Sequence, residues 1–498
     1  MDLLRTKSVE TSISDTDDPG YQLKRKLTAL DLTVFGIGVI IGAGIFTLTG
    51  KAASQFAGPG VVFSFVLAAV CCGLAALCYA EFASTIPVSG SAYTFSYAAL
   101  GELIAWIIGW DLVLELMLGA SVVAQGWSTY AVTFLDEIGL GWPDAIGPAD
   151  TEHFFWGHVN VLALLLVLLL TALIAIGIKE SLRVNLVLVG VKLFIVLFVI
   201  VAGLFYIHGA NYDPFIPPRS DPVDTGGLAQ PLVQWAFGLQ PQTYGVLGIV
   251  SGASVVFFAY IGFDVVATTA EEAKNPQRDL PRGIIASLTI CTVLYVAVAL
   301  VVTGMVRYDK IDTEAALASA FKDVGRDGFA TLIAAGAVAG LTTVVMTLMI
   351  GATRVLFAMS RDALLPPGFG HTNSRTGTPV MITLTIGGLV ALVAGFTPIG
   401  KLEEMVNIGT LSAFALVSAA VPVLRRTRPD LERSFRVPLS PVLPILAALV
   451  CVYLMANLSL ETWLRFLIWM ALGFGLYFGY GYRKSRLATE AGAATVSP

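Results

Sequence analysis

The sequence predicts an all-α polytopic membrane protein with twelve transmembrane helices, arranged as two inverted repeats of five helices plus two C-terminal helices. Three observations support this prediction. Hydrophobic residues make up 56% of the 498 residues and charged residues 13%, about half the charge of a typical soluble protein. The apolar residues form separate runs of about 20, the length that crosses a bilayer core. Two of these runs, five apart in chain order, are interrupted by glycine, as an inverted repeat would require.

The predicted spans follow the apolar runs. They lie at 30–49, 61–86, 103–134, 159–177, 184–207, 249–269, 283–306, 329–359, 379–396, 405–424, 441–458 and 464–482. The chain is expected to divide into a disordered cytoplasmic tail (1–26), a first repeat (27–207), an extracellular loop (208–247), a second repeat (248–424), a basic loop with the last two spans (425–482) and a cytoplasmic tail (483–498). Disorder is expected in this tail because residues 1–20 are rich in Ser, Thr and Asp and lack aromatic anchors.

The basic residues that flank the spans predict the orientation. One set of alternate connections holds most of the Lys and Arg, among them Lys24, Arg25 and Lys26 before the first span and the cluster at 425–436. The other set holds few. Because basic loops stay in the cytoplasm, we expect a multi-pass protein of the cell membrane with both termini cytoplasmic.

All five cysteines fall within apolar runs: Cys71, Cys72, Cys78, Cys291 and Cys451. No CxxC or Cys/His metal spacing accompanies them. We interpret them as packing residues, and we expect neither a metal site nor a cofactor.

The first span is interrupted by glycine in its middle. Residues 35–49 read FGIGVIIGAGIFTLT, with Gly36, Gly38, Gly42 and Gly44, and each glycine costs a helix about 1 kcal/mol relative to alanine. In hydrocarbon, backbone groups freed from a helix are tolerated only where protein, water or a ligand satisfies them, so a break here indicates a cavity. The alternative is a close-packed helix seam at Gly38 and Gly42.

The sixth span contains a second break, marked by Gly262 and Asp264. A carboxylate in an apolar run is costly and indicates a function. The first span is expected to enter from the cytoplasm and the sixth from outside, so the two breaks can hold a substrate between the repeats. The proline-rich loop at 208–247 is predicted to form a lid or short helices, with a passive cover as the alternative.

Four blocks carry a resemblance to a known family. They read GIGVIIGAGIF at 36–46, GWDLVLELMLGASVVAQGWS at 109–128, FFAYIGFDVVATTAEEAKNPQRDLPRGI at 257–284 and RVLFAMSRDALLP at 354–366. Together they resemble the cationic amino acid transporter family, including its bacterial members, within the amino acid, polyamine and organocation (APC) transporter superfamily. The resemblance spans 27–365 and implies the LeuT-like inverted-repeat fold and amino acid transport.

An amino acid zwitterion needs donors for its carboxylate and acceptors for its ammonium. At the first break, the outer half-helix directs N–H groups and a positive dipole end at the cavity, while the inner half offers free carbonyls. We therefore expect Ala43 and Gly44 to bind the carboxylate and the Ile40 carbonyl to bind the ammonium. Gly42 and Gly44 leave room for the ligand. The family resemblance implies the same positions.

The second break is predicted to add the carbonyls of Phe258, Ala259 and Ile261. Phe258 and Tyr260 are candidates for an aromatic gate over the ligand, but aromatic residues also fill membrane cores, and both interpretations stay open. Asp264 is expected to orient this break by accepting backbone N–H bonds.

Lys192 is expected near the middle of the bilayer, about 13 Å deeper than Arg183 at ~1.5 Å per residue. Burial disfavours the charged form of an amine, so this side chain is a candidate proton carrier. The resemblance implies that its ammonium replaces the sodium ion of related transporters and bridges the Gly42 carbonyl and Thr342 or Thr343. That arrangement argues against sodium coupling. The alternative is a fixed charge that joins the first, fifth and eighth spans.

Asp111 and Glu115 share one face of the third span because they lie four residues apart. Glu115 matches a family glutamate and is a candidate proton relay, with a hydrogen bond to a neighbouring span as the alternative. Thr347 aligns with the family position that lines the side-chain pocket, where animal arginine carriers have glycine. We therefore expect small or mid-sized neutral substrates with some tolerance for basic ones. Selectivity for arginine or lysine is the alternative.

The leading functional prediction is a secondary transporter that moves L-amino acids inward with protons. Its expected partners are the amino acid, the proton and the lipid bilayer, and no nucleic acid; an accessory subunit is unknown. An intramembrane enzyme is one alternative, but the four histidines lie outside the predicted core and no HExxH, GxSxG or P-loop motif occurs. A channel is the other alternative.

Overall fold

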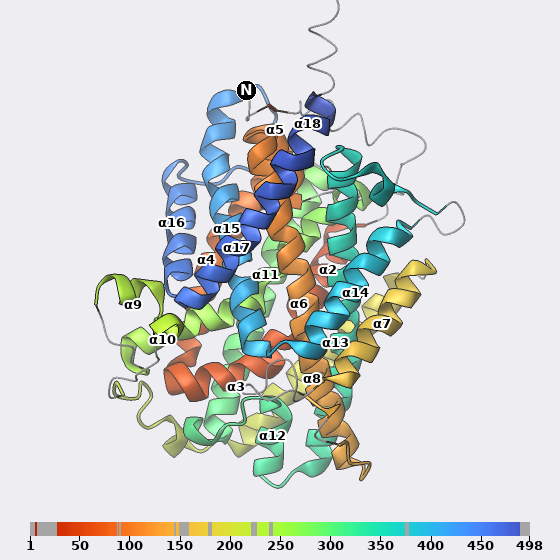
Figure 1. The fold of residues 1–498 in the computed structure, drawn as a ribbon. Coiled ribbons are helices and arrows are strands. Elements are labelled where there is room, and N and C mark those ends of the chain that lie inside the picture. Colours follow the sequence, from red (N-terminus) through yellow and green to blue (C-terminus); the bar gives the residue numbers. More distant parts are fainter. Residues whose placement is uncertain are drawn as a thin grey trace, which may run out of the picture.

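A computed structural model describes the chain at 5–6, 27–86, 88, 91–143, 146–148, 159–177, 182–220, 227–238, 243–373 and 378–488. Most of the two predicted tails, 1–26 and 483–498, lies outside these residues. Within the described part the chain is helical (Figure 1), and its extended pairings are two isolated bridges, Leu27 with Ala273 and Pro231 with Ser459.

Eight helical stretches of the described residues are long and apolar enough to cross a membrane, and four further apolar helices are shorter. The long stretches contain α4 (Val61–Thr85), α6 (Glu102–Glu137), α8 (Leu182–Gly203), α10 (Gly245–Val256), α11 (Pro276–Met305), α13 (Asp327–Arg361), α15 (Ile399–Thr427) and α17 (Leu460–Leu476). The shorter helices are α2 (Ala29–Ile40), α7 (Val161–Ala175), α14 (Val380–Phe396) and α16 (Val442–Ala456). Every predicted span overlaps one of these helices. The prediction of an all-α polytopic membrane protein is confirmed.

The bundle has two ends, named here by their place in Figure 1. The upper end carries α5 (Ser91–Ala99) and α18 (Tyr482–Lys484), and the lower end carries α3 (Thr49–Ala52) and α12 (Ala316–Asp323). Neither α5 nor α12 was expected from the sequence, because both are too short to be recognised as spans.

The predicted loop at 208–247 contains short helical turns in its described part. They are η6 (Gly209–Tyr212), η7 (Gly227–Ala229) and α9 (Leu232–Ala236). The prediction of short helices is therefore confirmed, and α10 begins four residues before the predicted sixth span.

Helix packing places α6 at the centre of the bundle, against α13 and α15, while α11 packs against α2 and α4. Large apolar side chains on the outer helices remain exposed, for example Leu169 on α7, Leu392 on α14 and Leu449 on α16. Exposed apolar surface of this extent fits contact with lipid.

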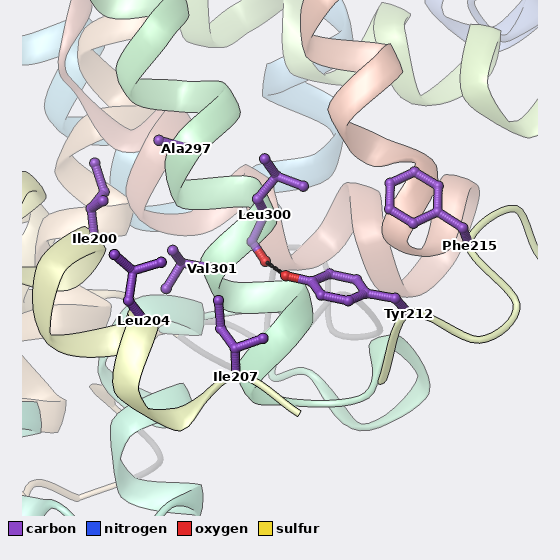
Figure 2. A pocket seen from close by; sticks show the side chains of 8 residues that line it. All are labelled: Ile200, Leu204, Ile207, Tyr212, Phe215, Ala297, Leu300 and Val301. Atoms are coloured by element: carbon purple, nitrogen blue, oxygen red, sulfur yellow. Dashed lines mark hydrogen bonds between the residues drawn. The ribbon is translucent and has the colours of Figure 1, made fainter. Parts of the chain in front are cut away.

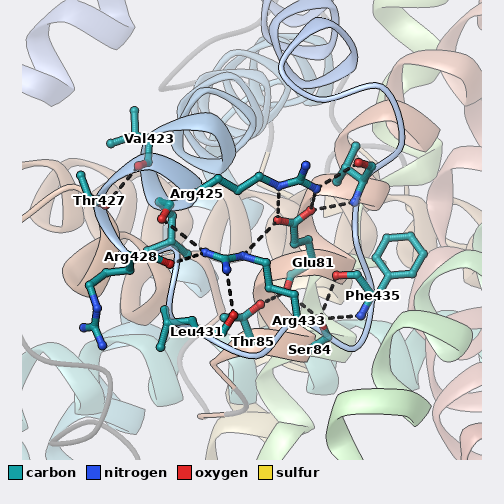
Figure 3. Close-up of polar contacts among 12 residues, drawn as sticks. Glu81, Ser84, Thr85, Val423, Arg425, Thr427, Arg428, Leu431, Arg433 and Phe435 are labelled. Carbon is teal, nitrogen blue, oxygen red and sulfur yellow. Dashed lines mark hydrogen bonds and ion pairs between the residues drawn. The ribbon is translucent and has the colours of Figure 1, made fainter.

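A buried ion-pair network joins α4 to the segment after α15 at the upper end (Figure 3). The Arg425 guanidinium donates to both carboxylate oxygens of Glu81, at 2.8 and 2.5 Å, and the amide of Val437 donates to the same carboxylate at 2.7 Å. Arg433 lies 3.6 Å from Glu81. Several partners for one buried carboxylate offset its cost of desolvation, so this network holds α4 and α15 together.

Arg5 packs on the upper end, although 1–26 was predicted to be disordered. Its guanidinium donates to Glu102 and to the Tyr482 carbonyl, each at 3.1 Å. Glu102 is fully buried and also accepts hydrogen bonds from the hydroxyls of Tyr97 and Tyr477. Arg5 therefore has specific partners in Glu102 and Tyr482, which the composition of the tail did not predict.

Candidate substrate-binding site

The first span is interrupted in its middle. The helix α2 ends at Ile40, Ile41 (φ −71°, ψ 85°) and Gly42 leave the helix, and the chain resumes with a π-helical turn at Gly44–Leu48. The predicted break is confirmed. In a continuous helix the Gly42 amide would pair with the Gly38 carbonyl, but here it donates to the Ile40 carbonyl at 2.8 Å. The break therefore frees the Gly38 carbonyl.

The sixth span is interrupted as well. After α10, a short 3-10 turn covers Phe257–Tyr260, Ile261 is extended, and a second 3-10 helix follows at Asp264–Glu272. Gly262 has φ +116°, which favours glycine. A β-carbon at Gly262 would also lie 2.7 Å from the Val39 side chain. The second predicted break is confirmed, and glycine is required there by both conformation and space.

The two broken spans run in opposite directions. The amide of Leu27, before α2, donates to the Glu272 carbonyl at 2.9 Å, at the end of the sixth span. At the other end, the amide of Tyr244 donates to the Phe56 carbonyl at 2.9 Å. Each span therefore begins where the other ends, as an inverted arrangement requires.

The two breaks touch at Gly44. A β-carbon there would overlap the backbone of Ala259, whereas one at Gly42 would make an ordinary contact with Val344 of α13. Glycine at position 44 is thus required by the close approach of the two spans. This reason differs from the predicted one, which was room for a ligand. At Gly42 that explanation stays a prediction.

Tyr295 of α11 joins the two breaks. Its hydroxyl oxygen lies 2.7 Å from the Ile40 carbonyl oxygen and 2.9 Å from the Ala259 carbonyl oxygen, and its single proton is shared between these two acceptors. Both are carbonyls that were predicted to bind a substrate ammonium. Sequence reasoning missed this residue because a tyrosine in an apolar run, outside any motif, carries no functional signal.

The two candidate gate residues, Phe258 and Tyr260, are both buried. The Tyr260 hydroxyl donates to the Phe65 carbonyl at 3.0 Å, and its ring lies 5.2 Å from the ring of Tyr295. These contacts favour packing over gating for Tyr260. For Phe258 both interpretations stay open.

Lys192 of α8 reaches the first break. Its ammonium donates to the Gly38 carbonyl at 2.6 Å, and the side chain is only 1% exposed. Its stem packs against Gly340 of α13, where a β-carbon would lie 2.7 Å from the lysine Cγ. Lys192 thus connects the first, fifth and eighth spans. Its described hydrogen bond goes to the carbonyl that the break frees, four residues before the predicted partner, Gly42.

The three candidate threonines of α13 use their hydroxyls within their own helix. Thr342, Thr343 and Thr347 each donate to a carbonyl of α13 at 2.8 Å. Thr342 also accepts a hydrogen bond from the Trp127 indole at 2.9 Å. The predicted bridge from Lys192 to Thr342 or Thr343 and the pocket role of Thr347 stay predictions.

The acidic residues of the third span lie in different environments. Asp111 accepts a hydrogen bond from Ser412 of α15 at 2.9 Å. Glu115 is fully buried, and neither of its carboxylate oxygens has a hydrogen-bond partner in the part of the chain that the structure describes. A buried, unpaired carboxylate is costly, so Glu115 is a candidate to hold a proton.

Asp264 is the first residue of the 3-10 helix after the second break. Its side chain is buried at this point of the chain. The predicted role of Asp264 in orienting the break stays a prediction.

Two ion pairs join helices at the lower end of the bundle. Lys51 of α3 pairs with Glu403 of α15, and Lys322 of α12 pairs with Glu137 of α6 at 2.8 Å. The hydrogen bond and charge of Glu137 raise the pKa of Lys322. Lys322 therefore stays protonated around neutral pH and supplies no pH dependence there.

An apolar cavity of about 380 Å³ lies beside the C-terminal end of α8 (Figure 2). It is lined by Ile200, Leu204, Ile207, Tyr212, Phe215, Ala297, Leu300 and Val301. The hydroxyl of Tyr212 is already bonded to the Leu300 carbonyl at 2.7 Å. A zwitterion needs several polar partners, and this apolar lining does not offer them.

The described residues contain no group of three or more His, Cys, Asp or Glu that could hold a metal ion. All five cysteines are free and buried.

Two antiparallel apolar helices, each broken where it meets the other, are typical of secondary transporters. The sequence profile of the amino acid permease family matches 27–476. The chain belongs to this family, which is part of the APC superfamily, and the protein is a transporter rather than an enzyme.

Three relatives illustrate the similarity. The chain is 43% identical over 486 residues to the methylthioribose transporter of Bacillus subtilis (strain 168), covering 97% of this chain and 99% of that protein. It is 44% identical over 488 residues to the branched-chain amino acid permease BcaP of the same organism, with the same coverage. It is 38% identical over 428 residues to the vacuolar cationic amino acid transporter 4 of Arabidopsis thaliana, covering 86% of this chain and 68% of that protein. The predicted resemblance to cationic amino acid transporters is confirmed.

Proposed function

We propose that this protein is a secondary active transporter that imports L-amino acids by alternating access, coupled to protons and independent of sodium. The observation that carries the proposal is the contact between the two breaks at Gly44 and Ala259. It brings the backbone groups of the two breaks together inside the bundle. Half-helix N-termini suit a carboxylate and free carbonyls suit an ammonium, which are the two ends of a zwitterion.

The proposed binding mode uses both breaks. The N–H groups of Ala43 and Gly44 bind the carboxylate, and the carbonyls of Ile40 and Ala259 bind the ammonium. The carbonyls of Phe258 and Ile261 complete the set at the second break.

The proposed topology has twelve crossings in a 5+5 inverted repeat with two C-terminal helices. Twelve apolar helices and the antiparallel pair of broken spans support it. Arg5 contacts Tyr482 at the upper end, near the C-terminus, and the basic cluster with Arg425 lies at the same end. Because basic segments stay in the cytoplasm, we assign the upper end and both termini to the cytoplasmic side of the cell membrane.

Proton coupling is proposed to run through Lys192. The Lys192 ammonium lies at the Gly38 carbonyl, which the first break frees. It takes the role that a bound sodium ion plays in sodium-coupled relatives. Loss of a proton from Lys192 would release this carbonyl and loosen the first break. Glu115 is the second candidate for a proton site.

The proposed substrates are small or mid-sized neutral amino acids. Relatives named as branched-chain amino acid permeases, at 44% and 36% identity, support a neutral aliphatic side chain. The similarly close methylthioribose transporter points to a different substrate, but a sugar thioether has neither charge that the breaks are suited to bind. Selectivity for arginine or lysine is the second candidate, favoured by the plant cationic relative.

Uptake of labelled L-leucine into proteoliposomes tests the proposal. We expect saturable, stereoselective uptake that rises with an inward proton gradient and does not change when sodium is replaced. Competition by D-leucine, valine, arginine, lysine and methylthioribose then ranks the substrate classes. Competition by methylthioribose without competition by any amino acid would contradict the proposal, and an unsaturable conductance would indicate a channel.

A further inference from the structure

The Tyr295 hydroxyl is shared between two backbone oxygens that belong to different broken helices. It lies 2.7 Å from the Ile40 carbonyl oxygen and 2.9 Å from the Ala259 carbonyl oxygen. A hydroxyl has one proton and two acceptor lone pairs, so these three oxygens share a single donor from Tyr295. They form a cluster rich in acceptors, of the kind that an ammonium with three N–H donors can complete.

The ring of Tyr295 is held in place. The side chain is fully buried, with its ring centroid 5.7 Å from that of Phe65 and 5.2 Å from that of Tyr260. The hydroxyl of Tyr260 is itself fixed by the Phe65 carbonyl. The Tyr295 hydroxyl can therefore turn its proton from one carbonyl to the other, while its oxygen stays in place.

The hydroxyl approaches the first break from α11, whereas Gly42 faces Val344 of α13. The Ile40 carbonyl also accepts a hydrogen bond from the Gly42 amide, only two residues ahead. An ammonium that enters from the α13 side can replace this hydrogen bond between Gly42 and Ile40 without displacing Tyr295.

We propose that Tyr295 is a positioning residue of the amino-group site: its hydroxyl keeps the Ile40 and Ala259 carbonyls side by side, so that both accept hydrogen bonds from the ammonium of the substrate. This inference rests on the proposed function. It adds that the protein selects ligands with an α-amino group over analogues with the same carboxylate and side chain but no amine. Tyr295 sets that selectivity from outside the two broken helices.

The test compares L-leucine with its 2-hydroxy analogue, which differs only in carrying a hydroxyl in place of the amine. Inhibition constants for both are measured against labelled L-leucine uptake in proteoliposomes, for the unmodified protein and for Tyr295→Phe. We expect the substitution to weaken L-leucine about tenfold and to leave the hydroxy acid nearly unchanged, so that the preference for the amine falls about tenfold. Equal weakening of both ligands, or an unchanged preference, would overturn the inference.

Tyr130→Phe is the matched control. Tyr130 is also a fully buried tyrosine whose hydroxyl donates to a carbonyl of the first span, that of Phe46 at 2.7 Å, but this carbonyl lies beyond the break. We expect Tyr130→Phe to keep the amine preference. If Tyr295→Phe does not fold, 4-aminophenylalanine at position 295 restores a donor on the same ring. Its amine preference should be at least that of the unmodified protein, and a fall in a well-folded sample would refute the positioning role.

The outcomes separate this inference from the proposed function. If the unmodified protein does not transport amino acids, the proposed function fails. If it does transport amino acids, but Tyr295→Phe leaves the amine preference unchanged, only the inference fails.

Discussion

The two breaks are stabilised by charges that come from different places. At the first break α2 ends in free carbonyls, at the negative end of its dipole, and the matching cation is Lys192 on a separate helix. At the second break the following 3-10 helix begins at its positive end, and the matching anion is its own first residue, Asp264. A partner on the same segment moves with it. A partner on another helix can separate from it, so we propose that coupling acts on the first break while the second stays fixed.

The largest expected effect tests the contact between the breaks. Gly44→Val places a side chain where the Ala259 backbone lies, so the two spans cannot meet. We expect L-leucine uptake to fall at least a hundredfold, measured in proteoliposomes with protein that is monodisperse by size-exclusion chromatography.

Gly73→Val is the control for that change, because a β-carbon at Gly73 of α4 meets nothing within 4 Å. Near-normal uptake by Gly44→Val would show that the two breaks do not need to touch.

The next effect addresses the first break directly. Lys192→Met keeps the length of the side chain but removes the donor to the Gly38 carbonyl. We expect uptake to fall about tenfold, as for a lost hydrogen bond to a charged group, and to lose its dependence on external pH. Lys322→Met, a change at an exposed lysine of the lower end, should keep the pH dependence. A pH profile of Lys192→Met that matches the unmodified protein would defeat the coupling hypothesis.

A smaller effect is expected at the second break. Asp264→Asn removes the carboxylate at the start of the 3-10 helix, where the positive end of the helix favours a negative charge. We expect the protein to be destabilised by about 1–2 kcal/mol, seen as a lower Tm, with the shape of the pH profile retained. If Asp264→Asn also removed the pH dependence, the contrast between a fixed and a switched break would be wrong.

The smallest expected effect concerns the side-chain pocket. Thr347→Gly removes a half-buried side chain of α13 and should strengthen competition by arginine and lysine by about threefold to tenfold, a typical effect of pocket size. Thr353→Gly is the control, because the Thr353 hydroxyl is also bonded within α13, at 2.9 Å. An identical competition profile for the two variants would discard the pocket role of Thr347.

The features that could be predicted from the sequence are those encoded locally. Glycine within an apolar run predicted the break after Ile40, and Gly262 next to Asp264 predicted the second. The burial of Lys192 was expected from its distance to Arg183 along one helix. Each of these predictions needed only residues that are neighbours in the chain.

The features that were missed depend on how helices are rotated against one another. The hydrogen bond from Lys192 to the Gly38 carbonyl was not predicted, because three helices together determine where the ammonium lies. Glycine is required at position 44 because the backbone of Ala259, more than two hundred residues away in the chain, lies against it. The contacts of Tyr295 form only where the two breaks meet α11. The helices α5 and α12 were not predicted, because they are too short to contain the long apolar run by which a span is recognised.

The most direct test of the central claim is an experimental structure with L-leucine bound. The account predicts the ligand carboxylate at the N–H groups of Ala43 and Gly44, and its ammonium within hydrogen-bond distance of the Ile40 and Ala259 carbonyls. A ligand held elsewhere, for instance in the apolar cavity beside α8, or a continuous helix in place of either break, would contradict it.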